Sequence, residues 1–448
     1  MHYHHAIPLL PSRSSPSVGA SGKSLRVSAL CLGLGCCGIS PAFAQSTSPA
    51  DAGLLEQIGE LRAQQAQIAR MQQQTETRIR ALEARLGVAP PATPAPAAFA
   101  VAASAKSQEP RLKVGGDLRL RAQGDYSDSD GTNRTSSQLR ARIGATYAFN
   151  DLVTIGGRMV TGDGDDPNSS DVQLSNWNDD LQTGLDLAYA QFNFDGFKVY
   201  GGKIPNPFAR TDLVWDGDVN PQGVGAVYRL PLAGGGAFRA NGLFFTVDEQ
   251  AAGSDSSMGG VQLGFDSAAH GGLGFDASAG YYRYSLGSQT GADAGDWRSN
   301  RLDPDGSFMS DYELLDVVAG LTWQGSKEKW PLRIVGDYVK NLGAIDDQDT
   351  GYGIDVGLGR ASRPGDWRFT YGYSQTEVDA VLAAFSNDNI GIATNYNLHA
   401  LTLDYTPMPK TMISAIWYHY KPNNPLYAGT NQPDDWLDRV RVLFLMNF

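Results

Sequence analysis

Cysteine is almost absent from the sequence, and this scarcity limits what can hold the fold together. The 448 residues include three cysteines, Cys31, Cys36 and Cys37, all in one apolar stretch near the N-terminus. If that stretch is removed on export, no cysteine remains and no disulfide can stabilise the chain.

Two further shortages exclude whole classes of protein. Beyond the N-terminal region, no apolar run reaches the roughly 20 residues that a membrane-spanning helix requires. Basic residues are outnumbered, 36 against 48 acidic ones, which gives a formal net charge of −12. A nucleic-acid partner requires a basic face, so we expect no nucleic-acid binding.

The N-terminus has the features of an export signal. Lys23 and Arg26 precede an apolar run over 27–39, and the small-x-small site Ala42-Phe43-Ala44 follows. This pattern predicts a signal peptide over residues 1–44, with cleavage after Ala44. The removed segment holds basic but no acidic residues, so the remaining chain is more acidic still.

Residues 51–87 are rich in Gln, Ala, Arg and Glu and contain no proline. Two rows spaced by seven form a heptad seam, which predicts a coiled-coil stalk. A helix this polar is stable only when it packs against further copies of itself, so we expect self-association. A lone solvated helix is the alternative, and the choice between two and three helices in the coiled coil stays open. Residues 88–110, rich in proline and alanine, predict an extended linker. The seam rows are Leu54, Leu61, Ile68, Thr75 and Leu82, and Ile58, Gln65, Gln72, Ile79 and Leu86.

The last stretch, Trp436 to Phe448, alternates with a period of two. One register is apolar up to Phe448, and the other contains Arg439 and Arg441. The pattern predicts a strand with one apolar and one mixed face. A terminal aromatic strand resembles the closing strand of bacterial outer-membrane proteins, where it also serves as an assembly signal; an ordinary edge strand is the alternative.

Apolar alternation and turn signals recur from residue 111 to the end. Short turns and longer polar loops alternate between the segments, as they do when turns and loops lie on opposite sides of a membrane. We therefore predict an all-β fold over 111–448, a 16-stranded antiparallel transmembrane β-barrel preceded by an N-terminal coiled-coil helix. The expected strands are 111–124, 137–149, 152–162, 184–194, 197–204, 223–231, 237–247, 258–266, 272–285, 312–324, 330–340, 351–360, 366–376, 396–406, 410–421 and 436–448.

Aromatic residues support the same orientation. Seven of the eight strands that run down to the short turns end their apolar row in a ring, and the exception ends near Leu358. Rings at one depth predict an interfacial girdle. The rings are Phe149, Phe194, Tyr228, Phe265, Trp323, Tyr405 and Phe448.

If the apolar rows face lipid, the opposite rows line the lumen, and seven arginines then share one wall. So many guanidinium groups require water or acidic partners, so we expect the wall to face a wide, wet channel. The third long loop carries Arg210, Asp212, Asp216 and Asp218, and its aspartates are predicted to oppose the wall across a constriction. A loop lying over the rim is the alternative. The seven are Arg119, Arg121, Arg140, Arg142, Arg158, Arg439 and Arg441.

Three stretches, Lys203 to Phe208, Trp215 to Gly223 and Asp379 to Asp388, resemble the putative-porin family. That family is similar to the phosphate-selective porins of Gram-negative bacteria. The resemblance, over roughly 111–448, implies sixteen strands, a trimer and passive passage of small hydrophilic solutes. Phosphate selectivity does not follow, because the acidic third loop departs from a strongly basic pore.

The expected function is therefore that of a channel for small hydrophilic solutes or ions in a Gram-negative outer membrane, with the stalk in the periplasm. Expected partners are membrane lipid, further copies of the chain in a homotrimer, and the barrel-assembly machinery through Phe448. We expect no enzyme activity, catalytic residue, metal or cofactor. A structural tether from the outer membrane to the cell wall is the first alternative. A membrane-embedded hydrolase is the second, and it lacks a plausible Ser, His and acid grouping.

Overall fold

The computed structural model describes residues 111–127, 133–162, 167–174, 180–287, 298–325, 329–428 and 435–448. The signal peptide predicted over 1–44, the stalk over 51–87 and the linker over 88–110 lie outside these residues. Within them, no helix is long and apolar enough to span a bilayer. The helical elements described are two single 3₁₀ turns, η1 (Ala383–Phe385) and η2 (Pro425–Tyr427).

Sixteen long strands and one two-residue strand, β4, form a single sheet. Their bounds are β1 Leu112–Ser127, β2 Arg134–Ala148, β3 Val153–Thr161, β4 Val172–Gln173, β5 Thr183–Phe194, β6 Phe197–Lys203, β7 Gln222–Pro231, β8 Ala237–Asp248, β9 Ser256–Asp266, β10 Leu273–Ser285, β11 Glu313–Trp323, β12 Leu332–Asn341, β13 Thr350–Gly359, β14 Trp367–Thr376, β15 Tyr396–Tyr405, β16 Thr411–Pro422 and β17 Leu437–Asn447.

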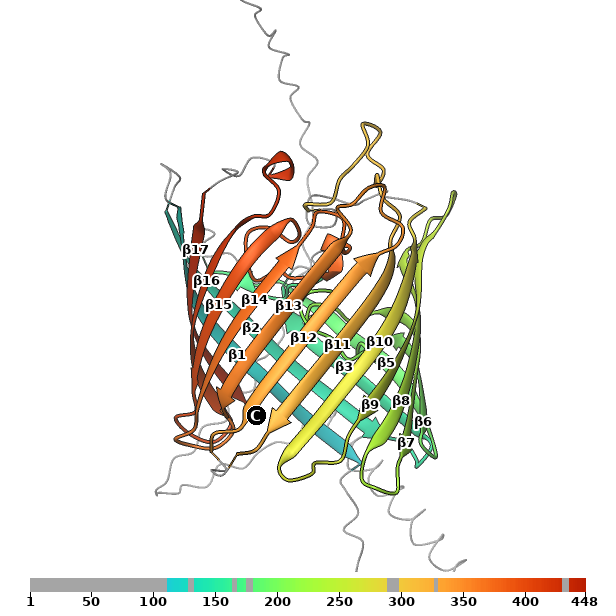
Figure 1. Ribbon diagram of the computed structural model, residues 1–448. Coiled ribbons are helices and arrows are strands. Elements are labelled where there is room, and N and C mark those ends of the chain that lie inside the picture. Colours follow the sequence, from blue (N-terminus) through green and yellow to red (C-terminus); the bar gives the residue numbers. More distant parts are fainter. Residues whose placement is uncertain are drawn as a thin grey trace, which may run out of the picture. The chain divides into compact units, whose positions relative to one another are not determined.

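The sheet closes on itself, which confirms the predicted barrel. Each long strand pairs antiparallel with the next along the chain, and β1 pairs with both β2 and β17. At the seam, the backbone N–H of Phe448 donates to the carbonyl of Gly116 at 3.0 Å. A closed cylinder leaves no strand edge unpaired, as hydrocarbon requires. Figure 1 shows the tilted strands wrapping around one interior.

Strand direction places the connections at two ends. The segments after β2, β5, β7, β9, β11, β13 and β15 lie at one end, and the remaining connections lie at the other (Figure 1). The expected strict difference in length is not met, because the turn 324–331 is longer than the loop 249–255. Alternation of strand direction, rather than connection length, fixes the side.

Apolar side chains cover the outer face of the barrel. On β17, Val440, Val442 and Met446 are exposed, whereas Arg441 between them is buried. This alternation is that of a strand with lipid on one side. Rings gather near the turns, where Trp367 stacks on Tyr405 with centroids 4.4 Å apart.

β13, the strand without a terminal ring, has a substitute near the turns. A Cβ atom built on Gly359 at its end would lie 3.1 Å from the Trp330 ring, so that ring covers the bare glycine. Near the loops, the exposed rings are mostly tyrosines, among them Tyr126, Tyr281, Tyr338, Tyr352 and Tyr371.

The main buried apolar cluster lies inside the barrel. Inward-facing residues of β8 to β12 surround Trp215, which is 0% exposed and comes from the third loop. Phe385 of η1 stacks on the Trp215 ring with centroids 5.9 Å apart. We call residues 162–182 loop 2, residues 204–221 loop 3 and residues 377–395 loop 7. Loops 3 and 7 thus share a core within the cylinder.

Candidate functional site

The seven predicted arginines gather on one part of the inner face. They come from β17, β1, β2 and β3, which are successive neighbours in the closed sheet. Because successive residues of a strand point to opposite faces, the arginines face inward and the apolar row faces outward. Arg121 is 7% exposed, whereas Leu120 beside it is 42% exposed and faces outward. We call Arg119, Arg121, Arg140, Arg142, Arg158, Arg439 and Arg441 the arginine wall.

Three carboxylates of the barrel strands neutralise part of the arginine wall. Asp117 on β1 binds Arg140 at 3.1 Å and Arg142 at 2.7 Å. Asp125 binds Arg439 at 2.5 Å, and Asp186 on β5 binds Arg158 at 2.5 Å. None of these three carboxylates was among the predicted pore-lining residues. Their inward-facing position in the strands was the available signal. On β1, Asp117 and Asp125 alternate in step with the inward-facing arginines.

Two further carboxylates reach the wall from loops. Asp171 of loop 2 binds Arg119 and Arg121, each at 2.6 Å. Asp218 of loop 3 binds Arg140 and Arg142, each at 3.1 Å. Charge-assisted contacts of this kind are stronger than neutral hydrogen bonds. Acidic loops therefore pack against part of the arginine wall and supply acidic partners of the kind that so many guanidinium groups were expected to require.

The three aspartates of loop 3 were expected to face the arginine wall together, but they have different partners. Asp218 alone makes ion pairs with the wall. Burial alone would raise the pKa of Asp218, but the guanidinium groups of Arg140 and Arg142 outweigh it and hold that pKa below its usual value. Burial, together with the nearby carboxylates of Asp388 and Asp212, raises the pKa of Asp216 to about 9. Asp216 is therefore uncharged at neutral pH.

Asp212, the third aspartate, points to a different partner. Its carboxylate accepts a hydrogen bond from the Asn389 side-chain amide at 2.9 Å. The Asn389 side-chain oxygen accepts one from Arg441 at 3.0 Å, and its backbone carbonyl accepts one from Arg439 at 3.0 Å. A single amide of loop 7 thus joins loop 3 to the arginine wall. The sequence offered no pattern that marks Asn389.

Loop 3 is anchored on the opposite side of the barrel as well. The backbone N–H and C=O groups of Ala209 bond to the Gln262 side chain on β9, at 2.8 and 2.7 Å. The Thr211 hydroxyl donates to Asp337 on β12. A loop that contacts inner residues of β2, β9 and β12 crosses the interior, so the alternative of a loop over the rim is wrong. Arg210 is less engaged: its guanidinium donates to the Gly217 carbonyl within the loop.

Two cavities with linings of opposite charge lie among the inner residues and loops of the barrel. One, of about 200 Å³, we call the arginine-lined cavity. Its charged lining is Arg121, Arg134, Arg298, Arg439, Arg441, Asp125 and Asp388.

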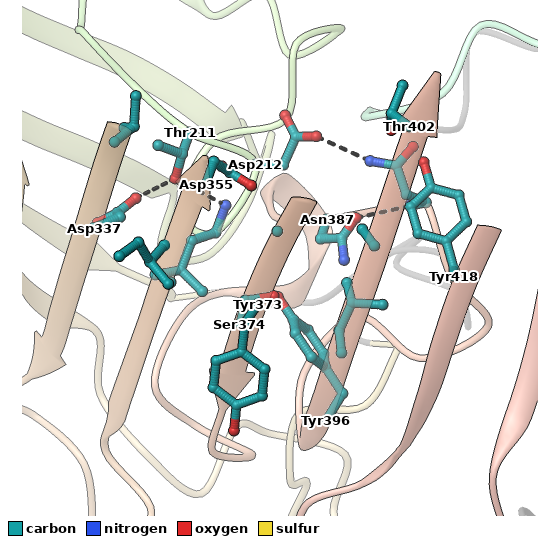
Figure 2. Close-up of a pocket in the computed structure, with 18 of the residues that line it drawn as sticks. Thr211, Asp212, Asp337, Asp355, Tyr373, Ser374, Asn387, Tyr396, Thr402 and Tyr418 are labelled. Atoms are coloured by element: carbon teal, nitrogen blue, oxygen red, sulfur yellow. Dashed lines mark hydrogen bonds between the residues drawn. The ribbon is translucent and has the colours of Figure 1, made fainter. Parts of the chain in front are cut away.

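The other, of about 420 Å³, we call the acid-lined cavity. Its charged lining is Asp212, Asp337, Asp355 and Arg210. In Figure 2, Asp337 and Asp355 lie at one side of it and Tyr418 at the other. A transverse field results, because positive and negative side chains face the same interior from different walls.

Among the described residues, no group of three or more His, Cys, Asp or Glu side chains is arranged to hold a metal ion. The inner polar groups are mostly paired with each other, as a structured and charged lining requires.

Comparison with a family model agrees with the resemblance in sequence. Residues 126–290 match the model of a family described as putative porin. The similarity to phosphate-selective porins receives no support from this match. No curated protein matches the chain in sequence.

Several solved structures of outer-membrane porins are similar in fold. The high-pH structure of OprB from Pseudomonas putida is 11% identical, with a TM-score of 0.51, and the match covers 75% of this chain and 94% of that one. OmpF of Salmonella typhi, in complex with daunomycin, is 14% identical with a TM-score of 0.47, over 75% and 97%. The trimer form of OmpT from Vibrio cholerae is 11% identical with a TM-score of 0.43, over 75% and 99%. At 11% identity, the likeness to OprB shows the fold alone. The family match and the barrel together support an outer-membrane channel.

Proposed function

We propose that this chain is an outer-membrane porin, a passive diffusion channel for small hydrophilic solutes or ions in a Gram-negative outer membrane. A closed barrel with an apolar outer row and a charged interior supports the proposal. The match of residues 126–290 to the putative-porin family supports it further. The predicted signal peptide and coiled coil fit an exported protein with a periplasmic, oligomerising stalk.

The observation that carries the proposal is the opposition of charge inside the barrel. The arginine wall stands on one side, and the carboxylates that line the acid-lined cavity stand on another. Buried charge is costly, and a protein that needed only a membrane anchor would have no use for it. We assign the role of pore lining to the arginine wall and to four loop 3 residues, Arg210, Asp212, Asp216 and Asp218.

Current through a planar lipid bilayer tests the channel directly. Stepwise current is expected when the purified protein is added, because each inserted pore adds a fixed conductance. A barrel that serves as a tether to the cell wall, with its interior sealed, gives no steps. Reversal potentials in a salt gradient then measure ion preference, which we expect the double variant Arg119→Ala/Arg121→Ala to shift toward cations. Unchanged selectivity would contradict the assigned lining.

We further propose a homotrimer in which β2, β3 and β5 form the contact. Ala145, Gly157 and Ala188 are directly paired across these three strands. They belong to the outward row, so their small side chains allow another barrel to approach closely. Phe448, at the seam, is proposed to present the chain to the barrel-assembly machinery.

The contact predicts that Gly157→Trp yields monomers, because the indole ring would stand between the barrels. Mass measurement in detergent checks it, with Ala277→Trp on the outer face of β10 as the matched control. The same measurement without residues 51–87 separates the contribution of the stalk. A trimer that survives Gly157→Trp would place the contact elsewhere.

A further inference from the structure

The acid-lined cavity has more negative charge than its partners neutralise. Asp212, Asp337 and Asp355 line it, against the single cation Arg210. The Arg210 guanidinium donates to the Gly217 carbonyl, and no ion pair joins it to these carboxylates in the part of the chain that the structure describes. The cavity as a whole therefore attracts positive charge.

Asp355 is the clearest case. It lies on the inner face of β13 and is exposed to the interior. Among the described residues it makes no hydrogen bond and no ion pair. An exposed carboxylate without a partner is available to bind a cation. The attraction is stronger than in bulk water, because the surrounding protein has a low dielectric constant.

The carboxyl groups of β11 and β12 beside the cavity also lack positive partners. Asp337 is 7% exposed, and its diagonal neighbour on β11, Asp316, is 1% exposed. One carboxylate oxygen of each side chain accepts a hydrogen bond, from the Tyr282 hydroxyl for Asp316 and from the Thr211 hydroxyl for Asp337. Yet the Oδ1 atom of each has no donor among the described residues. Two carboxyl groups this close are stable only with a proton or a cation between or beside them.

The other side of the cavity is aromatic. Tyr396 and Leu398 of β15 and Tyr418 of β16 line it. In Figure 2, Tyr418 lies across the space from Asp337 and Asp355. Tyr418 already interacts with a cation, since the Arg441 guanidinium lies 5.4 Å from its ring centre. Tyrosine faces attract ammonium and guanidinium groups and also pack against aliphatic carbon.

We propose that the acid-lined cavity is a binding site for a small organic cation, an ammonium or guanidinium group on a short hydrocarbon chain. This rests on the proposed function, because the solute must enter the interior to reach the site. The charged group lies between Asp355 and Asp212, and the hydrocarbon lies along Tyr396 and Tyr418. The volume of about 420 Å³ accommodates such a solute together with water. An organic anion is directed instead toward the arginine-lined cavity.

The test uses the full mature chain in a planar bilayer, with n-butylammonium chloride as the probe. Added butylammonium is expected to interrupt the open-pore current in a concentration-dependent manner, whereas neutral n-butanol of the same shape is not. Asp355→Asn should weaken the apparent affinity for butylammonium by about fivefold, the size expected for one partly solvated charge contact. Asp195→Asn, in the β5–β6 turn, makes the same charge change outside the cavity and should keep the wild-type affinity.

Binding is measured separately by calorimetry on the detergent-solubilised protein, which needs no current. Heat of butylammonium binding that is lost in Asp355→Asn and kept in Asp195→Asn supports the site, whether or not the pore conducts. Equal interruption by butanol and butylammonium, or equal affinity of wild type and Asp355→Asn, overturns it. Normal current with neither interruption nor heat overturns the site but leaves the channel standing. Absence of current from wild-type protein counts against the channel alone.

Discussion

At the scale of single residues, the interior is governed by which carboxylates are charged. Asp218 lies between Arg140 and Arg142, whose charges favour its ionised form. Asp216, two residues earlier, is 6% exposed and near other carboxylates, which favour its neutral form. Two aspartates on one short segment thus contribute differently to the field at neutral pH.

This difference predicts opposite results from two similar substitutions. Asp218→Asn removes a negative charge and leaves Arg140 and Arg142 with Asp117 alone, so the reversal potential at pH 7 should shift toward anion preference. Asp216→Asn should change the reversal potential little at pH 7, because the carboxyl it replaces is already protonated.

The pH dependence completes this prediction. As the pH rises through about 9, wild-type Asp216 ionises and gains a charge that Asp216→Asn does not, so wild type should become more cation-preferring than the variant. Below pH 8 the two should agree. An Asp216→Asn shift at pH 7 as large as that of Asp218→Asn would show that Asp216 is charged.

At the scale of elements, Trp215 is the largest fully buried side chain of loop 3 within the barrel. The ring is 0% exposed, packs edge-on against Tyr282 at 5.7 Å and stacks on Phe385. Truncating a buried Trp to Ala typically costs about 3–5 kcal/mol. Such a loss is larger than the net contribution of about 1 kcal/mol expected of any one neutral polar anchor, such as those at Ala209 and Thr211.

Trp215→Ala should therefore release loop 3 and raise the single-channel conductance, while the barrel itself stays folded. The strands pair through their own backbones and do not depend on the loop. Trp323→Ala is the matched control, because this ring is exposed on the lipid side. Conductance that is unchanged in Trp215→Ala would mean that the loop does not limit passage.

The strands were predictable from the sequence and the loop positions were not. A strand such as 366–376, observed as β14 over 367–376, is marked by its own alternation and by nearby turn residues. Contacts such as that between Asp212 and Asn389 join residues far apart in the chain. No local period records such a contact, because it depends on how the closed barrel brings loops together. The arginine wall was predictable in part. Local alternation marks each arginine as facing inward, and the closure of the barrel, which makes β17 and β1 neighbours, brings the arginines of separate strands together.

At the scale of the whole molecule, everything depends on closing the cylinder between β1 and β17. Gly116 is at the seam, and a Cβ atom built on it would lie 2.2 Å from the Arg142 carbonyl oxygen and 2.5 Å from the Phe448 ring. The glycine is therefore required for Phe448 to lie against β1. Gly201 on β6 has open space in the same position, with nothing within 4 Å.

These two glycines predict a contrast in folding. Gly116→Ala should lower the yield of folded barrel, because the added methyl group displaces Phe448 from the seam. Gly201→Ala should fold like wild type. The fraction of protein that migrates in the compact, heat-sensitive form on electrophoresis in detergent measures both. Equal yields would show that the seam tolerates the change and that Phe448 is not held by it.

The aromatic side chains at the two ends of the barrel differ in chemistry, and this difference bears on how deeply the barrel sits in the bilayer. Phenylalanine and tryptophan predominate beside the turns, and tyrosine predominates beside the loops. Movement of the cylinder toward its turn side would carry phenolic hydroxyls into hydrocarbon near the loops and push phenyl groups out of the bilayer into water near the turns. Displacement in that direction is thus opposed at both faces of the bilayer, which limits how deeply the mouth of the barrel sinks toward the lipid headgroups.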